Sequence, residues 1–243
     1  MRVLQHLAVA WALLEGFRLD VLVLGAKSST GIGSLPGEDY YIQKTLPNDL
    51  SYAAMLGDVA AARRVISFGV DVNARDQEGL TPLLRAVMYE NIEVVRLLLE
   101  HGADATIRGA DDYPGESGLI ALHAAAWSGR EDVYRLLLHA GADPTVLSHD
   151  GYSVLHRVAA SKAGDENHTA LWQHLIEERP VALDAVAQTD AKSCLHLAAA
   201  TGVAKFIDDV LAAIGDETDR SRLVNLPDKG GRTALHIAAN RTM

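Results

Sequence analysis

One pattern of Leu, Ala, Gly and Asp recurs along most of this chain, and its clearest copy spans residues 118–153. Within that copy the apolar spacing predicts a short helix over 122–126, a turn at Gly129 and a second helix over 133–138. The second helix ends at residues 141–144, Gly-Ala-Asp-Pro, because glycine accepts positive φ and proline cannot continue a helix. The unit is therefore a helix, a tight turn and a second helix, and an array of such units has no single central core.

A Leu-His pair marks the same point in successive units. His123 and His156 are 33 residues apart, and His196 and His236 follow at intervals of 40. With Gly-Leu-Thr-Pro-Leu in the second unit and Gly-Ala-Asp after its second helix, the pattern resembles the ankyrin repeat family. The resemblance implies an all-α solenoid of helix-turn-helix units with β-hairpin loops, with about five repeats plus a partial sixth. The longer intervals are interpreted as insertions in the loops.

We expect the repeat array to occupy residues 46–243 and an N-terminal extension to occupy 1–45. The fifth unit is followed by a long charged connector around residues 216–220. The sixth unit stops at Met243 before any second helix, which leaves an apolar face uncovered. We therefore expect either a truncated sequence or a partner that completes this end.

The extension allows two interpretations of its first residues. Arg2 precedes an apolar run over 7–14 that contains Ala-Val-Ala, which is a pattern found in secretory signal peptides. However, Gln5 and His6 interrupt the run, and the small residues lie inside it instead of after it. The alternative is an amphipathic helix that caps the open end of the array.

Residues 21–33 form a strand-like run followed by a glycine-rich segment, and they resemble the cofactor loop of short-chain dehydrogenases. A dinucleotide site needs a helix directly after the last glycine, because the aligned amides there hold the pyrophosphate. Here residues 34–37, Ser-Leu-Pro-Gly, follow instead. We interpret the stretch as a flexible loop and expect no cofactor.

Composition excludes several function classes. The net charge of -10 is opposite to the basic surface that nucleic-acid binding requires. Cys194 is the single cysteine, so no intrachain disulfide can form, and a cytoplasmic or nuclear location is expected. No run of about 18 apolar residues is present, so no membrane-spanning helix is predicted.

The repeated histidines do not indicate a metal site, and the cysteine does not indicate a catalytic nucleophile. The four histidines occupy equivalent positions on helices that pack about 8 to 10 Å apart, too far to share one zinc ion at about 2.1 Å from each ligand. The ankyrin resemblance implies that these histidines make hydrogen bonds that fix the turn. Cys194 occupies a position that is small or apolar in the other units, which indicates packing. No nucleophile, base and orienting group are recognisable together, so we predict no enzyme and no metal site.

The resemblance implies that residues four and five after the histidine position, and residues beside the hairpin glycine, face a concave binding groove. The large apolar residues at these positions are Leu80, Met88, Tyr89, Leu119, Trp127 and Tyr152. Trp127 is the expected anchor for a protein partner, and the alternative is that it packs on the inserted loop at 112–114.

We therefore predict a non-catalytic protein-binding module or scaffold that uses its concave groove and hairpin tips. A second hypothesis is that the array belongs to a larger ankyrin-containing protein, such as a ubiquitin-ligase adaptor or an enzyme, whose active part lies outside this chain. A third hypothesis, from a different class, is an enzyme built on the glycine-rich segment.

Overall fold

The computed structural model describes residues 46–109, 118–161, 166–178 and 183–241. The chain divides into two units, Met1–Thr45 and Leu46–Met243, and the described residues all belong to the second. The helix and the glycine-rich loop predicted within 1–45 lie outside the described residues. Twelve helices make up the regular structure of the described part: α4 (Leu46–Leu56), α5 (Val59–Ser67), α6 (Pro82–Met88), α7 (Ile92–Glu100), α8 (Ala121–Trp127), α9 (Glu131–His139), α10 (Val154–Ala160), α11 (Glu166–Glu178), α12 (Cys194–Thr201), α13 (Ala204–Ala213), α14 (Glu217–Val224) and α15 (Ala234–Arg241).

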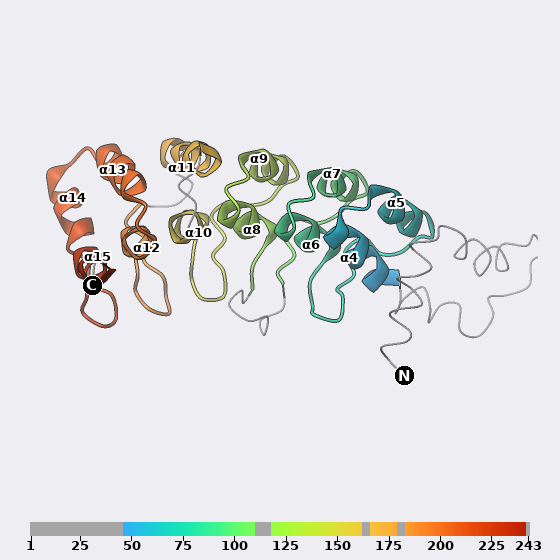
Figure 1. Cartoon of the computed structure of the whole chain (residues 1–243), viewed down its shortest axis with the longest axis horizontal. Coiled ribbons are helices and arrows are strands. Elements are labelled where there is room, and N and C mark those ends of the chain that lie inside the picture. Colours follow the sequence, from blue (N-terminus) through green and yellow to red (C-terminus); the bar gives the residue numbers. More distant parts are fainter. Residues whose placement is uncertain (1–45, 110–117, 162–165, 179–182, 242–243) are drawn as a thin grey trace, which may run out of the picture. The chain divides into compact units, whose positions relative to one another are not determined.

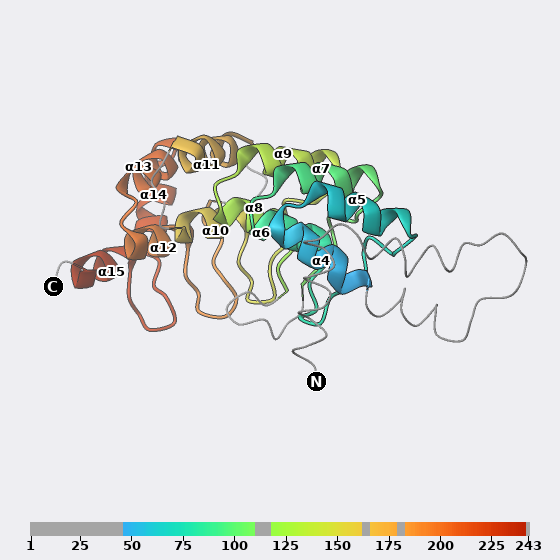
Figure 2. The same cartoon turned by 45° about the vertical axis from the view of Figure 1, so that its right-hand side comes forward.

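The helices form two rows (Figure 1). The inner row is α4, α6, α8, α10, α12 and α15, and the outer row is α5, α7, α9, α11 and α13. Each inner helix contacts the next inner helix, and each from α4 to α12 also contacts the outer helix of its own repeat. The hairpin loops extend from the inner row on the side away from the outer helices, as the turned view in Figure 2 also shows. The predicted all-α solenoid of helix pairs is confirmed.

A hydroxyl side chain caps the start of the inner helices α6 and α10. In α6 the Thr81 hydroxyl accepts the backbone N–H of Leu84 at 3.2 Å, and Pro82 follows at the first helical position. Proline is tolerated there because its missing N–H would have no helical partner. In α6, α8, α10 and α12 one leucine is at most 3% exposed, and these leucines are Leu83, Leu122, Leu155 and Leu195.

The outer helices bury one apolar face against the inner row and against each other. In α9 the buried side chains are Val133, Tyr134 and Leu137. Between α11 and α13 the Trp172 and Phe206 rings pack edge to face with centroids 5.6 Å apart. Aromatic pairs in this geometry add stabilisation beyond the area that they bury.

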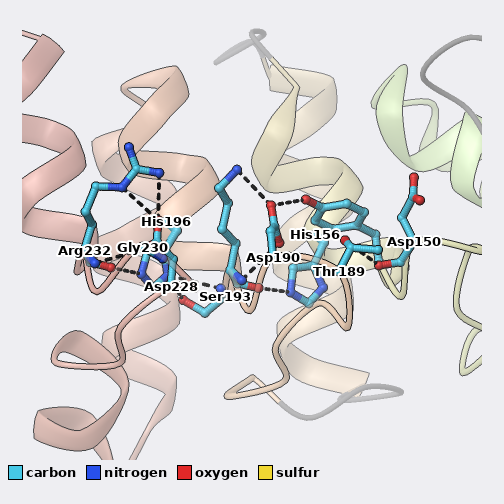
Figure 3. A network of polar contacts seen from close by, with 11 residues as sticks. Asp150, His156, Thr189, Asp190, Ser193, His196, Asp228, Gly230 and Arg232 are labelled. Carbon is cyan, nitrogen blue, oxygen red and sulfur yellow. Dashed lines mark hydrogen bonds and ion pairs between the residues drawn. The ribbon is translucent and has the colours of Figure 1, made fainter.

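A ladder of two histidines joins the inner helices α10 and α12 to the next hairpin (Figure 3). Nδ1 of His156 accepts a hydrogen bond from the Ser153 hydroxyl at 2.7 Å, and its Nε2–H donates to the Lys192 carbonyl at 3.2 Å. His196 repeats the arrangement with Ser193 and with the Arg232 carbonyl at 3.0 Å. The hydrogen-bonding role expected for these histidines is confirmed.

The ladder weakens toward the N-terminus. His123 donates to the Tyr152 carbonyl at 3.2 Å, but Ile120 replaces the serine, and the buried Nδ1 has no partner. In the second repeat Leu84 stands at the histidine position, and an ion pair between Arg85 and Asp76, 2.8 Å long and almost fully buried, fastens the helix to its hairpin. Asp76 also accepts the backbone N–H groups of Glu78 and Leu80, so its buried charge is well satisfied.

The expected connector after the fifth repeat is partly wrong, because it forms helix α14. The Asp216 carboxylate accepts the backbone N–H of Asp219 and so caps the first turn. Asp and Glu at the start of a helix also favour the positive end of its dipole. Asp and Glu are common both in charged loops and in the first turn of a short capped helix. The sequence pattern alone therefore did not distinguish a loop from helix α14.

The apolar face predicted to be uncovered in the sixth unit is present on α15. Leu235 is 73% exposed, whereas its counterpart Leu195 in the preceding repeat is 1% exposed. The difference arises because α12 contacts an outer helix and another inner helix, and α15 contacts α12 on one side.

Leu137→Ala is expected to lower the free energy of unfolding by roughly 2 to 5 kcal/mol, because the side chain is completely buried and its loss leaves a cavity. Chemical denaturation of the whole chain measures the change. Arg135→Ala, at an exposed site of the same helix, is the control and is expected to stay within about 1 kcal/mol of the native value. Equal losses for the two variants would show that the interface between repeats lies elsewhere.

Acid is expected to destabilise the array through its buried histidines. Burial lowers the pKa of His123 from 6.5 to about 3 and that of His156 to about 4. The unfolded chain therefore binds protons below pH 6.5 that the folded chain does not, and the free energy of unfolding falls as pH decreases from 6.5 toward 4. Each histidine contributes up to about 1.4 kcal/mol per pH unit.

Asp49 partly opposes this loss, since burial raises its pKa from 3.8 to about 6, which favours the folded state between those values as pH falls. Denaturation midpoints measured across this pH range test the balance. His156→Gln is expected to be less stable at neutral pH but to show a shallower pH dependence than the native chain. If His156→Gln showed the same pH dependence of the free energy of unfolding as the native chain, the acid sensitivity would not arise from His156.

Candidate functional site

The structure separates the six predicted binding residues into three groups. Tyr89 and Trp127 are 49% and 47% exposed, and Met88 is half-buried beside Tyr89. Leu80 and Leu119 are only 2% and 4% exposed, so the expectation that they face the groove is wrong. Tyr152 is half-buried and belongs to the polar network of the hairpins.

Leu80 is buried because the hairpin of the next repeat lies over it. A Cβ added at Gly109 would come within 3.0 Å of the Leu80 and Leu84 side chains, so the bare glycine backbone rests directly on them. In later repeats the residue before the capping hydroxyl is polar, Lys192 or Arg232, and a leucine here signals burial. That contrast was present in the sequence and identifies Leu80 as a packing residue.

Two exposed apolar side chains were missed by the sequence analysis. Tyr52 is 41% exposed and Leu56 is 60% exposed, both on α4. Leu56 lies five residues after Ser51, which is the same offset that selects Tyr89 after Leu84. The rule applied to the second and third repeats would have found Leu56 in the first.

These side chains define an apolar patch on three consecutive inner helices. We use the name apolar patch for Tyr52, Leu56, Met88, Tyr89 and Trp127. Their helices α4, α6 and α8 contact one another in that order. The positions that follow at the Trp127 offset are alanines, Ala160 and Ala200, so the large side chains are confined to repeats 1 to 3.

The backbone under the apolar patch is fixed by the neighbouring repeats. The Asn91 side-chain amide donates to the carbonyls of Ala54 and Met55 at 2.8 and 2.9 Å, at the C-terminal end of α4. A ring nitrogen of His168 hydrogen-bonds the Trp127 carbonyl at 3.2 Å. These bonds satisfy carbonyls that a helix end leaves without partners. The backbones that carry Leu56 and Trp127 are therefore held in place by groups other than their own side chains.

Charged groups border the apolar patch where the second and third repeats meet. Arg130 makes two hydrogen bonds to Asp132, at 3.0 and 2.8 Å, and lies 3.7 Å from the Glu90 carboxylate. The hydrogen bond to Asp132 is the largest cause that raises the pKa of Arg130. Arg85 also lies on α6, but it is buried and paired with Asp76 and with Glu78 at 2.8 Å.

Tyr152 links the hairpins of repeats 4 and 5 (Figure 3). Its hydroxyl donates to Asp190 at 2.7 Å, and the Lys192 ammonium group lies 2.8 Å from the same carboxylate. Burial, followed by the hydrogen bond to Asp190, raises the pKa of the Tyr152 hydroxyl. The Arg157 guanidinium lies 5.4 Å from the centre of the Tyr152 ring, within range of a cation–π contact. The Tyr152 hydroxyl and one face of its ring therefore already have partners within the protein.

The hairpins of repeats 3, 4 and 5 line a pocket of about 500 Å³ that is open to solvent. The guanidinium of Arg108 spans the two hairpins by donating to the carbonyls of Gly118 and Leu147 at 3.0 and 2.8 Å. The lining residues are Arg108, Val146, Leu147, Ser148, His149 and Gln188.

The described residues do not assemble a catalytic or metal site. Cys194 is buried, and burial raises the pKa of its thiol to about 12, which removes the thiolate needed for nucleophilic attack. No three His, Cys, Asp or Glu side chains in the described ranges are grouped to hold a metal ion. The glycine-rich segment 21–33 and the loop at 112–114 lie outside the described residues. In the described part, no helix has both the length and the apolar character needed to cross a membrane.

Comparison with known proteins gives a family match that agrees with this geometry. A family model described as ankyrin repeats (3 copies) matches residues 50–148. The putative ankyrin repeat protein YahD of Escherichia coli (strain K12) is 36% identical over 61 residues, which are 25% of this chain and 30% of YahD. The palmitoyltransferase AKR1 of Gibberella zeae is 33% identical over 85 residues, which are 35% of this chain and 11% of that protein.

A third relative is the human ankyrin repeat, SAM and basic leucine zipper domain-containing protein 1, with 32% identity over 80 residues, or 31% of this chain and 17% of that protein. The chain thus spans less than a third of the length of these curated relatives. Among solved structures, a chain in the complex of the Bd0816 predatory endopeptidase from Bdellovibrio bacteriovorus with immunity protein Bd3460 superimposes with a TM-score of 0.61. The match has 25% identity and covers 80% of this chain and 92% of that chain.

Proposed function

Because this chain carries ankyrin repeats, we propose that it is a non-catalytic protein-binding module whose partner docks on the apolar patch of repeats 1 to 3. Ankyrin arrays generally serve as interaction surfaces, and their concave faces suit extended contacts. The hairpin pocket beside Arg108 supplies a second contact area for the same partner.

The observation that carries the proposal is the exposure of Tyr52, Leu56, Tyr89 and Trp127 on three adjacent helices. Burying these side chains from water would gain free energy in proportion to the apolar area removed. Monomeric proteins seldom expose large side chains in a group without a binding role. Tryptophan and tyrosine are also enriched among residues that dominate binding energy.

Preorganisation supports the same role. Since hydrogen bonds from Asn91 and His168 fix the ends of α4 and α8, the chain loses little backbone freedom when a partner binds. The apolar patch is therefore suited to bind a partner without first folding itself.

A second candidate is that the array is the recognition part of a larger protein. The short share of each relative that the chain matches favours this candidate, because in the palmitoyltransferase AKR1 the similar segment is 11% of the whole. Partner binding through the apolar patch is common to both candidates.

An enzyme is one class of partner to test. The superimposed chain comes from a complex of an endopeptidase with an immunity protein, in which one protein binds another that is an enzyme. Purified peptidases added to this chain would reveal inhibition as a loss of their turnover of a peptide substrate.

Trp127→Ala is expected to weaken binding of a purified partner at least about tenfold, or about 1.4 kcal/mol, with little change in melting temperature. The partner would be isolated on the immobilised full chain, and its affinity measured by calorimetry. Val186→Ala is the matched control, because Val186 is exposed to a similar degree but lies in a hairpin outside the apolar patch. A large fall in melting temperature without loss of affinity would instead assign Trp127 to packing.

A further inference from the structure

Glu90 departs from the repeat pattern at the edge of the apolar patch. It directly follows Tyr89 and has a φ of 60°, in the left-handed region. The equivalent residues of neighbouring repeats are glycines, Gly57 and Gly129, with φ of 73° and 66°. A side chain in this conformation costs free energy, and such strain concentrates where a protein uses the residue.

The glycines at this position are sterically required in the flanking repeats but not here. A Cβ at Gly57 would come within 2.6 Å of the Asn91 side chain, and one at Gly129 would meet the His168 ring. At Glu90 the next repeat presents Arg130 instead, whose guanidinium lies 3.7 Å from the carboxylate. Of the turns that follow the inner helices of repeats 1, 2 and 3, the turn of repeat 2 therefore has room for a charged side chain.

The pairing with Arg130 does not consume the Glu90 carboxylate. Arg130 makes its two short hydrogen bonds to Asp132, whereas its one contact with Glu90 is longer. The Glu90 side chain remains 56% exposed and that of Asp132 49% exposed. Two carboxylates share one guanidinium, so a net negative charge remains beside Tyr89.

We propose that Glu90 selects the partner of the apolar patch: it pairs with a lysine or arginine in a peptide segment whose neighbouring apolar side chain packs on Tyr89 and Trp127. This inference rests on the proposed function and names the chemistry of the occupant. A cationic residue fits because the unneutralised carboxylate adjoins the apolar surface, and the chain as a whole carries a net charge of -10. Charge-assisted hydrogen bonds at the rim then add selectivity to the apolar contact.

The test uses a random peptide library displayed on phage and selected on the immobilised full chain. Selected peptides are expected to combine an aromatic or aliphatic residue with a nearby Lys or Arg. Fluorescence anisotropy of one synthetic peptide then measures affinity at low and high salt. The affinity is expected to fall as salt rises, because the exposed pair is screened.

Glu90→Gly is expected to lower the affinity for that peptide about tenfold and to reduce the salt dependence of the affinity. The melting temperature is expected to rise by about 2 °C, because glycine adopts the positive φ without strain. Ala191→Gly is the matched control. Ala191 has a φ of 56° in the hairpin of the fifth repeat, so this change relieves similar strain without touching the apolar patch. Its affinity for the peptide is expected to equal that of the native chain.

Charge reversal distinguishes the outcomes. The Glu90→Lys variant is expected not to bind the basic peptide. It is expected to bind a version of the peptide in which the Lys or Arg is changed to Glu. If both Glu90 variants bind the basic peptide as the native chain does and Trp127→Ala does not, the selection by Glu90 is overturned and the proposed function stands. If Trp127→Ala binds normally, the apolar patch itself is not the docking surface. A library that yields no basic, apolar peptides also contradicts the inference.

Discussion

Burial of leucine between successive inner helices is the interaction on which the rest of this structure depends. Leu83, Leu122 and Leu155 are each enclosed by the outer helix of their own repeat and by the next repeat. No repeat can bury its leucine alone, and stability therefore arises at the junctions. Leu235 illustrates the converse, because α15 lacks an outer helix among the described residues and the side chain is exposed.

The two halves of the array fasten these junctions by different chemistry. In repeats 4 and 5 a neutral histidine bridges its own serine and the carbonyl of the next hairpin, as His156 and His196 do. In repeat 2 the buried pair of Arg85 with Asp76 replaces the histidine. Burial lowers the pKa of His156, so the junction that it makes is sensitive to acid. The apolar patch spans both kinds of junction, because α6 carries Arg85 and α8 carries His123.

Part of the candidate site could be predicted from repeat position alone. The offset from the histidine position, which the ankyrin resemblance supplies, selects Met88, Tyr89 and Trp127, and the last two are exposed. The same reasoning placed Leu80 and Leu119 in the groove, and it was wrong because hairpin residues face the adjacent hairpin, as the contact of Leu80 with Gly109 shows. A repeat pattern specifies a position within a unit but does not specify which side chain of the next unit lies over it.

The amino-acid sequence by itself determined the fold class and placed both helices of the clearest repeat, and the ankyrin resemblance implied the bonding role of the histidines. It could do so because helix periodicity, capping residues and turn glycines act within a single unit of about 33 residues. Only the tertiary structure decided which exposed residues form one surface and that Glu90 keeps a free-facing carboxylate beside it. Those properties depend on contacts between units, such as the contact of Arg130 with Glu90, which are 40 residues apart in sequence. No single unit contains both residues of that contact.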